Sequence, residues 1–142
     1  MHKVYLGLGT NLGDKEANLK TAFEEIRKRV GEVTSQSAFY ASEPWGFESD
    51  NSFLNAVCCV HTHLSPMEIL SMTQEIEREL GRTKKSVGGI YSDRMIDIDI
   101  LLYDDLRIHT SELTIPHPLM WERDFVMLPL HEIAPHITPS SF

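Results

Sequence analysis

The stretch Arg94-Met95-Ile96-Asp97-Ile98-Asp99-Ile100, which runs on to Tyr103, decides how this chain folds. Isoleucine alternates with aspartate in it, and successive side chains of a β-strand point to opposite faces of the sheet. We therefore predict a strand over Met95–Tyr103 that buries its isoleucines against helices. The carboxylates of Asp97 and Asp99 then lie side by side on the other face.

The segments around this strand predict an α+β fold. We expect strands at Val4–Leu8, Val33–Tyr40 and Phe53–His63. Apolar residues at helical spacing predict two helices, one carrying Leu19, Ala22, Phe23, Ile26 and Val30, the other running from Pro66 to Gly81. A small hairpin (Leu106–Thr114), a short helix near Trp121–Glu132 and a loosely held tail (Ile137–Phe142) are expected to follow. The order strand, helix, two strands, helix, strand is typical of a two-layer sandwich with a largely antiparallel sheet.

Size and composition exclude several classes of protein. The 142 residues, of which 42% are hydrophobic and 24% charged, fit one domain spanning residues 1–142. A net charge of -8 argues against binding to a nucleic-acid backbone. No apolar run approaches the roughly 20 residues that span a bilayer. Cys58 and Cys59 are neighbours on a predicted strand, point to opposite faces and are expected to stay free thiols. We expect a cytoplasmic protein, and a monomer.

The paired aspartates suggest a metal site. Two Mg²⁺ ions about 3.5–4 Å apart would neutralise Asp97 and Asp99 and bind the oxygens of a triphosphate. The alternative is a solvated sheet face, which is common for alternating aspartates. A group of cations surrounds the strand and suits a phosphate chain: Arg82, Lys84, Lys85, Arg94, His117 and Arg123. The same cations could instead stabilise a helix C-terminus, and His117 could cap a turn.

Two further patterns concern ligands. Phe53 and Asn55 share one strand face, as an aromatic ring and an amide that would suit a flat heterocycle. The alternative is a core phenylalanine beside a capping asparagine. The glycines at positions 7, 9 and 13 fit neither common nucleotide-binding spacing. We assign them to a tight turn, with a helix cap at Thr10 or Asn11.

Taken together, these segments resemble the 6-hydroxymethyl-7,8-dihydropterin pyrophosphokinase family. The resemblance covers about Val4 to Pro135. It rests on five motifs in fixed order: Gly9-Thr10-Asn11-Leu12-Gly13, Phe53-Leu54-Asn55-Ala56, Gln74-x-x-Glu77-x-x-x-Gly81-Arg82, Arg94-x-x-Asp97-x-Asp99-Ile100 and Pro116-His117-Pro118-x-Met120-x-x-Arg123-x-Phe125.

The resemblance implies a ferredoxin-like βαββαβ sandwich with helices on one face, and transfer of pyrophosphate from ATP to the hydroxymethyl group of the pterin. It implies catalytic roles for Arg82, Arg94, Asp97 and Asp99, the aspartates holding two Mg²⁺ ions. It implies ATP contacts from Gln74, Glu77, Lys84, Lys85, His117 and Arg123. It implies a pterin site formed by Ser42, Glu43, Pro44, Trp45, Phe53, Asn55 and Phe125, where the family usually has tyrosine in place of Phe53.

One segment departs from the family pattern. Val87–Asp93 is about two residues longer than expected and lacks the tryptophan and proline usual there. Our hypothesis is that this loop is a lid that orders when both substrates bind. Two other readings of the chain stay open at this point: a ligand-binding module without catalysis, and a phosphatase using the same metals.

Overall fold

An antiparallel sheet forms the centre of the computed structural model, which describes residues 1–43, 52–81 and 95–142. Within these residues the sheet has five strands, in the order β2-β4-β1-β5 with β3 also paired to β4. The strands are β1 (His2–Thr10), β2 (Glu32–Gln36), β3 (Tyr40–Ser42), β4 (Phe53–Thr62) and β5 (Asp97–Tyr103). Because β1 and β4 lie in the middle, they carry the best-protected positions of the sheet.

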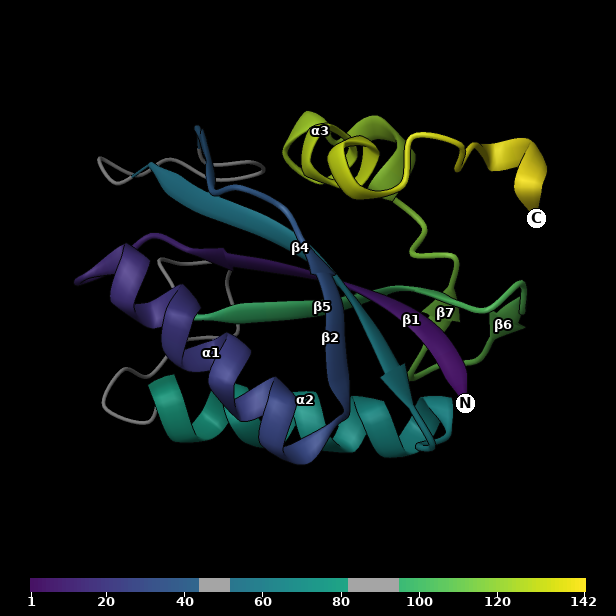
Figure 1. Ribbon diagram of the computed structural model, residues 1–142, viewed down its shortest axis with the longest axis horizontal. Helices are drawn as coiled ribbons and strands as arrows, with labels where there is room; N and C mark the ends of the chain where they lie inside the picture. The colour runs from purple at the N-terminus through teal and green to yellow at the C-terminus, as the bar shows by residue number, and fades with distance from the viewer. Residues whose placement is uncertain (44–51, 82–94) are drawn as a thin grey trace.

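Helices cover both faces of this sheet. Helix α1 (Lys15–Arg29) and helix α2 (Pro66–Gly81) lie on one face, and α3 (Asp124–Ile133) lies across the other (Figure 1). Alternate residues of each strand therefore enter two separate cores. On β5, Ile98 and Ile100 pack in the core that contains the α1 and α2 residues, whereas Leu101 packs in the core that contains α3.

The predicted fold class is confirmed. The order β1-α1-β2-β4-α2-β5 is βαββαβ, and each pair of neighbouring strands that the structure describes is antiparallel. The two crossover helices share one face, as expected. The last helix, α3, lies on the opposite face, a position that the prediction of helices on one face did not include.

The predicted strand Val33–Tyr40 is interrupted in the structure. The backbone N–H of Ser37 donates to the Val57 carbonyl (2.9 Å), while its hydroxyl accepts a hydrogen bond from the Val57 N–H (2.9 Å). A side chain thus takes the place of a backbone acceptor in the ladder, which ends β2 at Gln36 and lets β3 begin at Tyr40. Residues 37–39 between the two strands are irregular.

Two other local predictions were wrong. The cap of α1 is Asp14, whose carboxylate accepts from the Ala17 N–H (3.1 Å), because β1 continues through the buried Thr10 and the turn comes at Gly13 (φ 65°). The C-terminal tail is packed: Ile137 is buried, and the Phe142 ring lies 6.2 Å from that of Trp121. The end of the chain forms a short 3₁₀ helix, η2 (Pro139–Ser141).

The remaining elements join β5 to α3. A small hairpin, β6 (Ile108–His109) and β7 (Thr114–Ile115), is followed by the 3₁₀ helix η1 (Met120–Glu122). Cys58 and Cys59 are buried free thiols in the two different cores, as the strand pattern predicts. No helix among the described residues combines the length and the apolar character needed to cross a bilayer.

Candidate active site

A row of three residues crosses the sheet face that α3 covers. Gly9 of β1 pairs with Asn55 of β4 on one side and with Asp97 of β5 on the other. Paired residues of neighbouring strands share a face, so Asn55 and Asp97 point to the same side across a position without a side chain. Strands lie about 4.8 Å apart, which places the two side chains on the order of 10 Å from each other.

The side chain of Asn55 has a fixed orientation. It is 3% exposed, and its amide nitrogen donates to the Ser42 hydroxyl (2.7 Å) and to the Tyr40 carbonyl (3.1 Å). Because the nitrogen is committed to β3, the amide oxygen turns toward β1. An added Cβ on Gly9 would lie 3.1 Å from that oxygen and 3.5 Å from the Phe53 ring. Phe53 and Asn55 thus lie together over Gly9, as the two-residue spacing predicts.

The first turn of α3 faces the aspartates. An Arg123 guanidinium nitrogen lies 4.0 Å from a carboxylate oxygen of Asp99, and its side chain is only 12% exposed. The same guanidinium lies 5.4 Å from the centre of the Phe125 ring. Arg123 and Phe125 therefore enter the site from above, while Asn55 and Asp99 rise from the sheet below.

Glu77 of α2 reaches the free edge of the sheet next to the aspartates. Its carboxylate accepts a hydrogen bond from the Ile98 N–H (2.7 Å), which faces away from β1. Burial raises the pKa of Glu77 to about 8, and the hydrogen bond and charge of Asp97 and the charge of Asp99 add to this, against the opposing effect of the Ile98 hydrogen bond. Gln74 lies one turn earlier on α2 with an exposed side chain.

His117 occupies the turn between β7 and η1. Its backbone N–H donates to the Leu101 carbonyl (3.0 Å), and its ring nitrogen Nδ1 accepts from the Leu119 N–H (3.3 Å). This assigns the ring proton of the neutral form to Nε2. Burial and the nearby charge of Arg123 lower the pKa of His117, and Asp97 opposes them. A neutral imidazole that donates through Nε2 is therefore the resting form at neutral pH.

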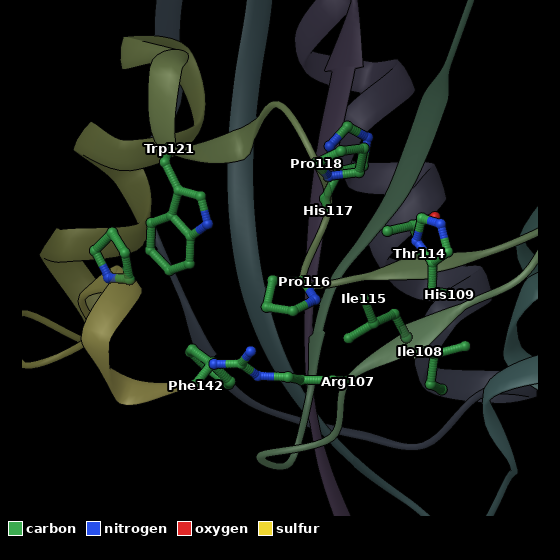
Figure 2. Close-up of a pocket in the computed structure, with 11 residues that line it drawn as sticks. Arg107, Ile108, His109, Thr114, Ile115, Pro116, His117, Pro118, Trp121 and Phe142 are labelled. Atoms are coloured by element: carbon green, nitrogen blue, oxygen red, sulfur yellow. The ribbon is translucent and has the colours of Figure 1, made fainter.

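A pocket of about 390 Å³ adjoins this turn. Its lining runs from His117 and Pro118 at one end to Arg107 and Phe142 at the other, with Trp121 along one side (Figure 2). His117 thus lies between this pocket and the aspartates of β5.

The site suits Mg²⁺, an ion that takes oxygen ligands and that proteins often bind through one or two carboxylates together with substrate phosphates. Asp97 and Asp99 provide such a pair on one face, opposite Gly9 and Gly7 of β1, which bring no side chain into the space. Their charges also help to raise the pKa of Glu77, after the larger effect of burial. In the part of the chain that the structure describes, no group of three or more histidine, cysteine, aspartate or glutamate side chains is arranged to hold a metal. A bound phosphate chain would supply the missing ligands.

The structure brings together most predicted site residues that it describes. Asp97, Asp99, Glu77, His117, Arg123 and Phe125 surround one side of the site, and Ser42, Phe53 and Asn55 the other. Glu43 follows β3 and is exposed. Six predicted residues and the divergent loop fall outside the described residues: Pro44, Trp45, Arg82, Lys84, Lys85, Arg94 and Val87–Asp93.

The role of two glycines was not predicted from the sequence. Gly7 and Gly9 were assigned to a tight turn, but both lie within β1 and pair with Asp99 and Asp97. A signal was available, because the two glycines have the same two-residue spacing as the two aspartates and so must share a face of their strand.

Comparison with known proteins identifies the family. The profile of 7,8-dihydro-6-hydroxymethylpterin-pyrophosphokinase matches residues 5–135. The chain is 53% identical to the 2-amino-4-hydroxy-6-hydroxymethyldihydropteridine pyrophosphokinase of Porphyromonas gingivalis, covering 97% of this chain and 95% of that protein. It is 42% identical to the enzyme of the same name from Aquifex aeolicus, covering 96% and 83%.

A solved structure supports the same fold. The crystal structure of an HPPK-DHPS in complex with substrates superimposes with a TM-score of 0.75 at 19% identity. It aligns with 99% of this chain, which spans only 41% of that longer protein. The profile match and the sequence identities together decide the assignment: this chain belongs to the 7,8-dihydro-6-hydroxymethylpterin-pyrophosphokinase family.

Proposed function

We propose that this protein transfers the pyrophosphoryl group of ATP to the hydroxymethyl group of 6-hydroxymethyl-7,8-dihydropterin, a step of folate biosynthesis. In this reaction the pterin hydroxyl oxygen attacks the β-phosphorus, the bond from that phosphorus to the α-phosphate oxygen breaks, and AMP leaves. The observation that carries the proposal is the row Asn55–Gly9–Asp97. It joins a side chain suited to a heterocycle edge to a side chain suited to a metal-bound phosphate.

The pterin half of the site lies on β3 and β4. The amide oxygen of Asn55 accepts a hydrogen bond from the N–H edge of the pterin, and the amide nitrogen stays bound to Ser42 and Tyr40. Phe53 and Phe125 stack on the two faces of the ring. The proposal also includes Ser42, Glu43, Pro44 and Trp45 as the wall of the pocket.

The phosphate half lies on β5, α2 and the turn after β7. Asp97 and Asp99 hold two Mg²⁺ ions, which neutralise and align the phosphates when bound. Arg123 and the Nε2–H of His117 donate to phosphate oxygens. The remaining residues proposed for the ATP side are Gln74, Glu77, Arg82, Lys84, Lys85 and Arg94. Loss of the proton from the pterin hydroxyl would be assisted either by polarisation by a bound Mg²⁺ or by Asp97, which stands in the row that leads to Asn55.

We further propose a cytoplasmic monomer. Cys58 and Cys59 are buried thiols, which suits a reducing compartment. The large hydrophobic residues exposed among the described residues (Met1, Met67, Leu106 and Leu128) lie on separate elements and form no obvious contact surface. Light scattering after size-exclusion chromatography measures the oligomeric state directly.

The test is the release of AMP from ATP and Mg²⁺, with and without the pterin. Three proteins are compared: the natural chain, Asp97→Asn, and Asp105→Asn as a control that makes the same chemical change at an exposed residue beyond β5. The proposal expects pterin-dependent AMP from the natural chain and from Asp105→Asn, with almost none from Asp97→Asn. Inorganic phosphate as the product would indicate a phosphatase instead. Binding of ATP or pterin without any turnover would indicate a ligand-binding module.

A further inference from the structure

Glu132 on the last turn of α3 ties the helix to the edge of the sheet. Its two carboxylate oxygens each lie 3.1 Å from the Ala38 backbone nitrogen, and one accepts a hydrogen bond from the Tyr40 hydroxyl at 2.5 Å. This is the short distance typical of a hydroxyl that donates to a charged carboxylate. The same hydrogen bond raises the pKa of Tyr40. One side chain thus holds two residues of the segment that enters β3.

The Ala38 N–H points away from the sheet, because this segment pairs with β4 on one side only. The Ser37 N–H donates to the Val57 carbonyl (2.9 Å), and successive N–H groups of an extended chain point to opposite sides. The next N–H, that of Ala38, therefore faces away from β4, and Glu132 accepts from it. The carboxylate on the helix thus satisfies a donor that β4 does not reach.

Tyr40 connects this contact to the pterin half of the site. It pairs directly with Asn55 across the β3–β4 ladder, and its carbonyl accepts from the Asn55 amide nitrogen at 3.1 Å. A continuous series of hydrogen bonds therefore runs from Glu132 through Tyr40 to Asn55. Any displacement of β3 changes both acceptors that hold the Asn55 amide, since Ser42 lies on the same short strand.

The helix that carries Glu132 also carries the opposite wall of the site. Phe125 lies seven residues before Glu132, which is two helical turns and returns to the same side of α3. The distance between Phe125 and the β3–β4 pair sets the width of the space for a stacked ring. Glu132 joins these two walls at the end away from the aspartates.

We propose that Glu132 is a positioning residue for pterin recognition: by holding β3 through Tyr40 and Ala38, it fixes the orientation of Asn55 and the gap to Phe125. The inference rests on the proposed function and names a residue that serves the same site without touching substrate. Glu132 is exposed, and hydrogen bonds made at the surface add little net stability, because water replaces them in the unfolded chain. Its loss is therefore expected to appear in pterin affinity rather than in folding.

The experiment measures two dissociation constants, that of the pterin and that of a non-hydrolysable ATP analogue. The pterin is added to protein that already contains Mg²⁺ and the analogue. The proteins are the natural chain, Glu132→Ala, Glu132→Gln, Tyr40→Phe and the double variant Tyr40→Phe/Glu132→Ala.

The control is Asp104→Asn. The Asp104 carboxylate also binds a backbone N–H (Lys3, 2.7 Å) and a side chain (His2, 2.8 Å), but it lies at the other end of β5. Asparagine tolerates the positive φ of Asp104.

We expect Glu132→Ala to weaken pterin binding by about three- to tenfold, as for the loss of one or two hydrogen bonds, while the affinity for the ATP analogue stays unchanged. Glu132→Gln keeps an acceptor oxygen and should fall between Glu132→Ala and the natural chain. The double variant should lose less free energy of pterin binding than the two single variants lose together, because Tyr40 and Glu132 act through one contact. Asp104→Asn should bind pterin as the natural chain does.

Three outcomes separate the possibilities. If the natural chain binds pterin and Glu132→Ala binds it equally well, the positioning role is overturned while the proposed function stands. Equal weakening of pterin and ATP analogue binding, or the same loss in Asp104→Asn, would also overturn it, because it would indicate general destabilisation. Failure of the natural chain to bind pterin would overturn the proposed function itself.

Discussion

Asn55 and Asp97 occupy the same row of the sheet, with Gly9 between them on the middle strand. One belongs to β4 and the other to β5, and 42 positions of the chain separate their residue numbers. The backbone pairing of β1 with both strands is what makes them neighbours across a site. The two halves of the proposed active site are therefore held in register by β1.

Gly9→Ala tests this register directly. The added methyl group would lie 3.1 Å from the Asn55 amide oxygen, so the Asn55 amide must shift by a few tenths of an ångström. We expect about tenfold weaker pterin binding, the equivalent of roughly 1–2 kcal/mol of overpacking. Gly7→Ala is the matched control for the pterin half, because it adds the same methyl group to the same strand and the atoms nearest to that group belong to Leu101, at 3.4 Å, not to Asn55. Isothermal titration with pterin compares the two, and equal affinities would contradict the prediction.

Asn55→Asp tests the orientation of the amide. Aspartate loses both donated hydrogen bonds and places a negative charge next to the Tyr40 carbonyl, which then lacks its buried donor. A cost of about 2 kcal/mol or more corresponds to roughly thirtyfold weaker pterin binding. Ser42→Ala removes only one acceptor and should weaken binding by about threefold. Affinity for an ATP analogue is the control in both variants. Natural pterin affinity in Asn55→Asp would refute the assignment.

Glu77→Gln tests the raised pKa at the edge of the sheet. In the folded chain the Glu77 carboxyl has a pKa of about 8, against an ordinary value of 4.5. Between these values the folded state holds a proton that the unfolded chain has released. This group therefore makes the free energy of unfolding fall as pH rises from about 4.5 to 8, by at most about 1.4 kcal/mol per pH unit.

Glutamine can still accept from the Ile98 N–H and donate to Asp97, but it does not titrate. Urea denaturation in metal-free buffer across this pH range compares the two proteins. We expect the difference in the free energy of unfolding, natural chain minus Glu77→Gln, to decrease steadily as the pH rises toward 8. A difference that does not change with pH would show that Glu77 titrates normally in the folded state.

Gly31→Ala tests a packing constraint away from the site. A methyl group there would overlap the His61 carbonyl oxygen, and the next residue, Glu32, pairs with His61 in the β2–β4 ladder, so neither backbone can move far. We expect a loss of about 2–4 kcal/mol in the free energy of unfolding, or failure to fold. Gly81→Ala is the control, since among the described residues its methyl group would meet Met95 at 3.8 Å, an ordinary contact distance. Thermal denaturation measures both, and similar midpoints would contradict the clash.

The layout of the fold could be predicted because its signals are local. Alternating isoleucine and aspartate fixed the two faces of β5, and the apolar spacing in α1 and α2 fixed which sides of these helices are buried. The side of the sheet covered by α3 could not be predicted in this way. Its position depends on a second core, which contains Val57, Leu101 and Leu130. These residues are far apart in the sequence, so no local pattern predicts that they belong to one core.

Pairs of site residues could be predicted from the sequence, but the way in which the strands bring these pairs together could not. The sequence shows that Phe53 lies with Asn55 and that Asp97 lies with Asp99, because each pair has the two-residue spacing of a strand. It does not show that β1 stands between the pairs, since strand order is set by long-range pairing. The Ser37 hydroxyl that ends β2 is equally hidden, because its acceptor role depends on the distant Val57 N–H.

The bare position at Gly9 has a consequence for inhibition and resistance. A compound that spans both halves of the site must pass over Gly9, which offers only main chain between the side chains of Asn55 and Asp97. A point mutation can weaken the binding of a compound by reshaping a side chain that the compound touches, and Gly9 itself has no side chain to reshape. The accessible change at this position is to add bulk, and that bulk would press first on the enzyme's own Asn55. A mutation at Gly9 that weakened the binding of such a compound would therefore also impair the protein's own pterin site.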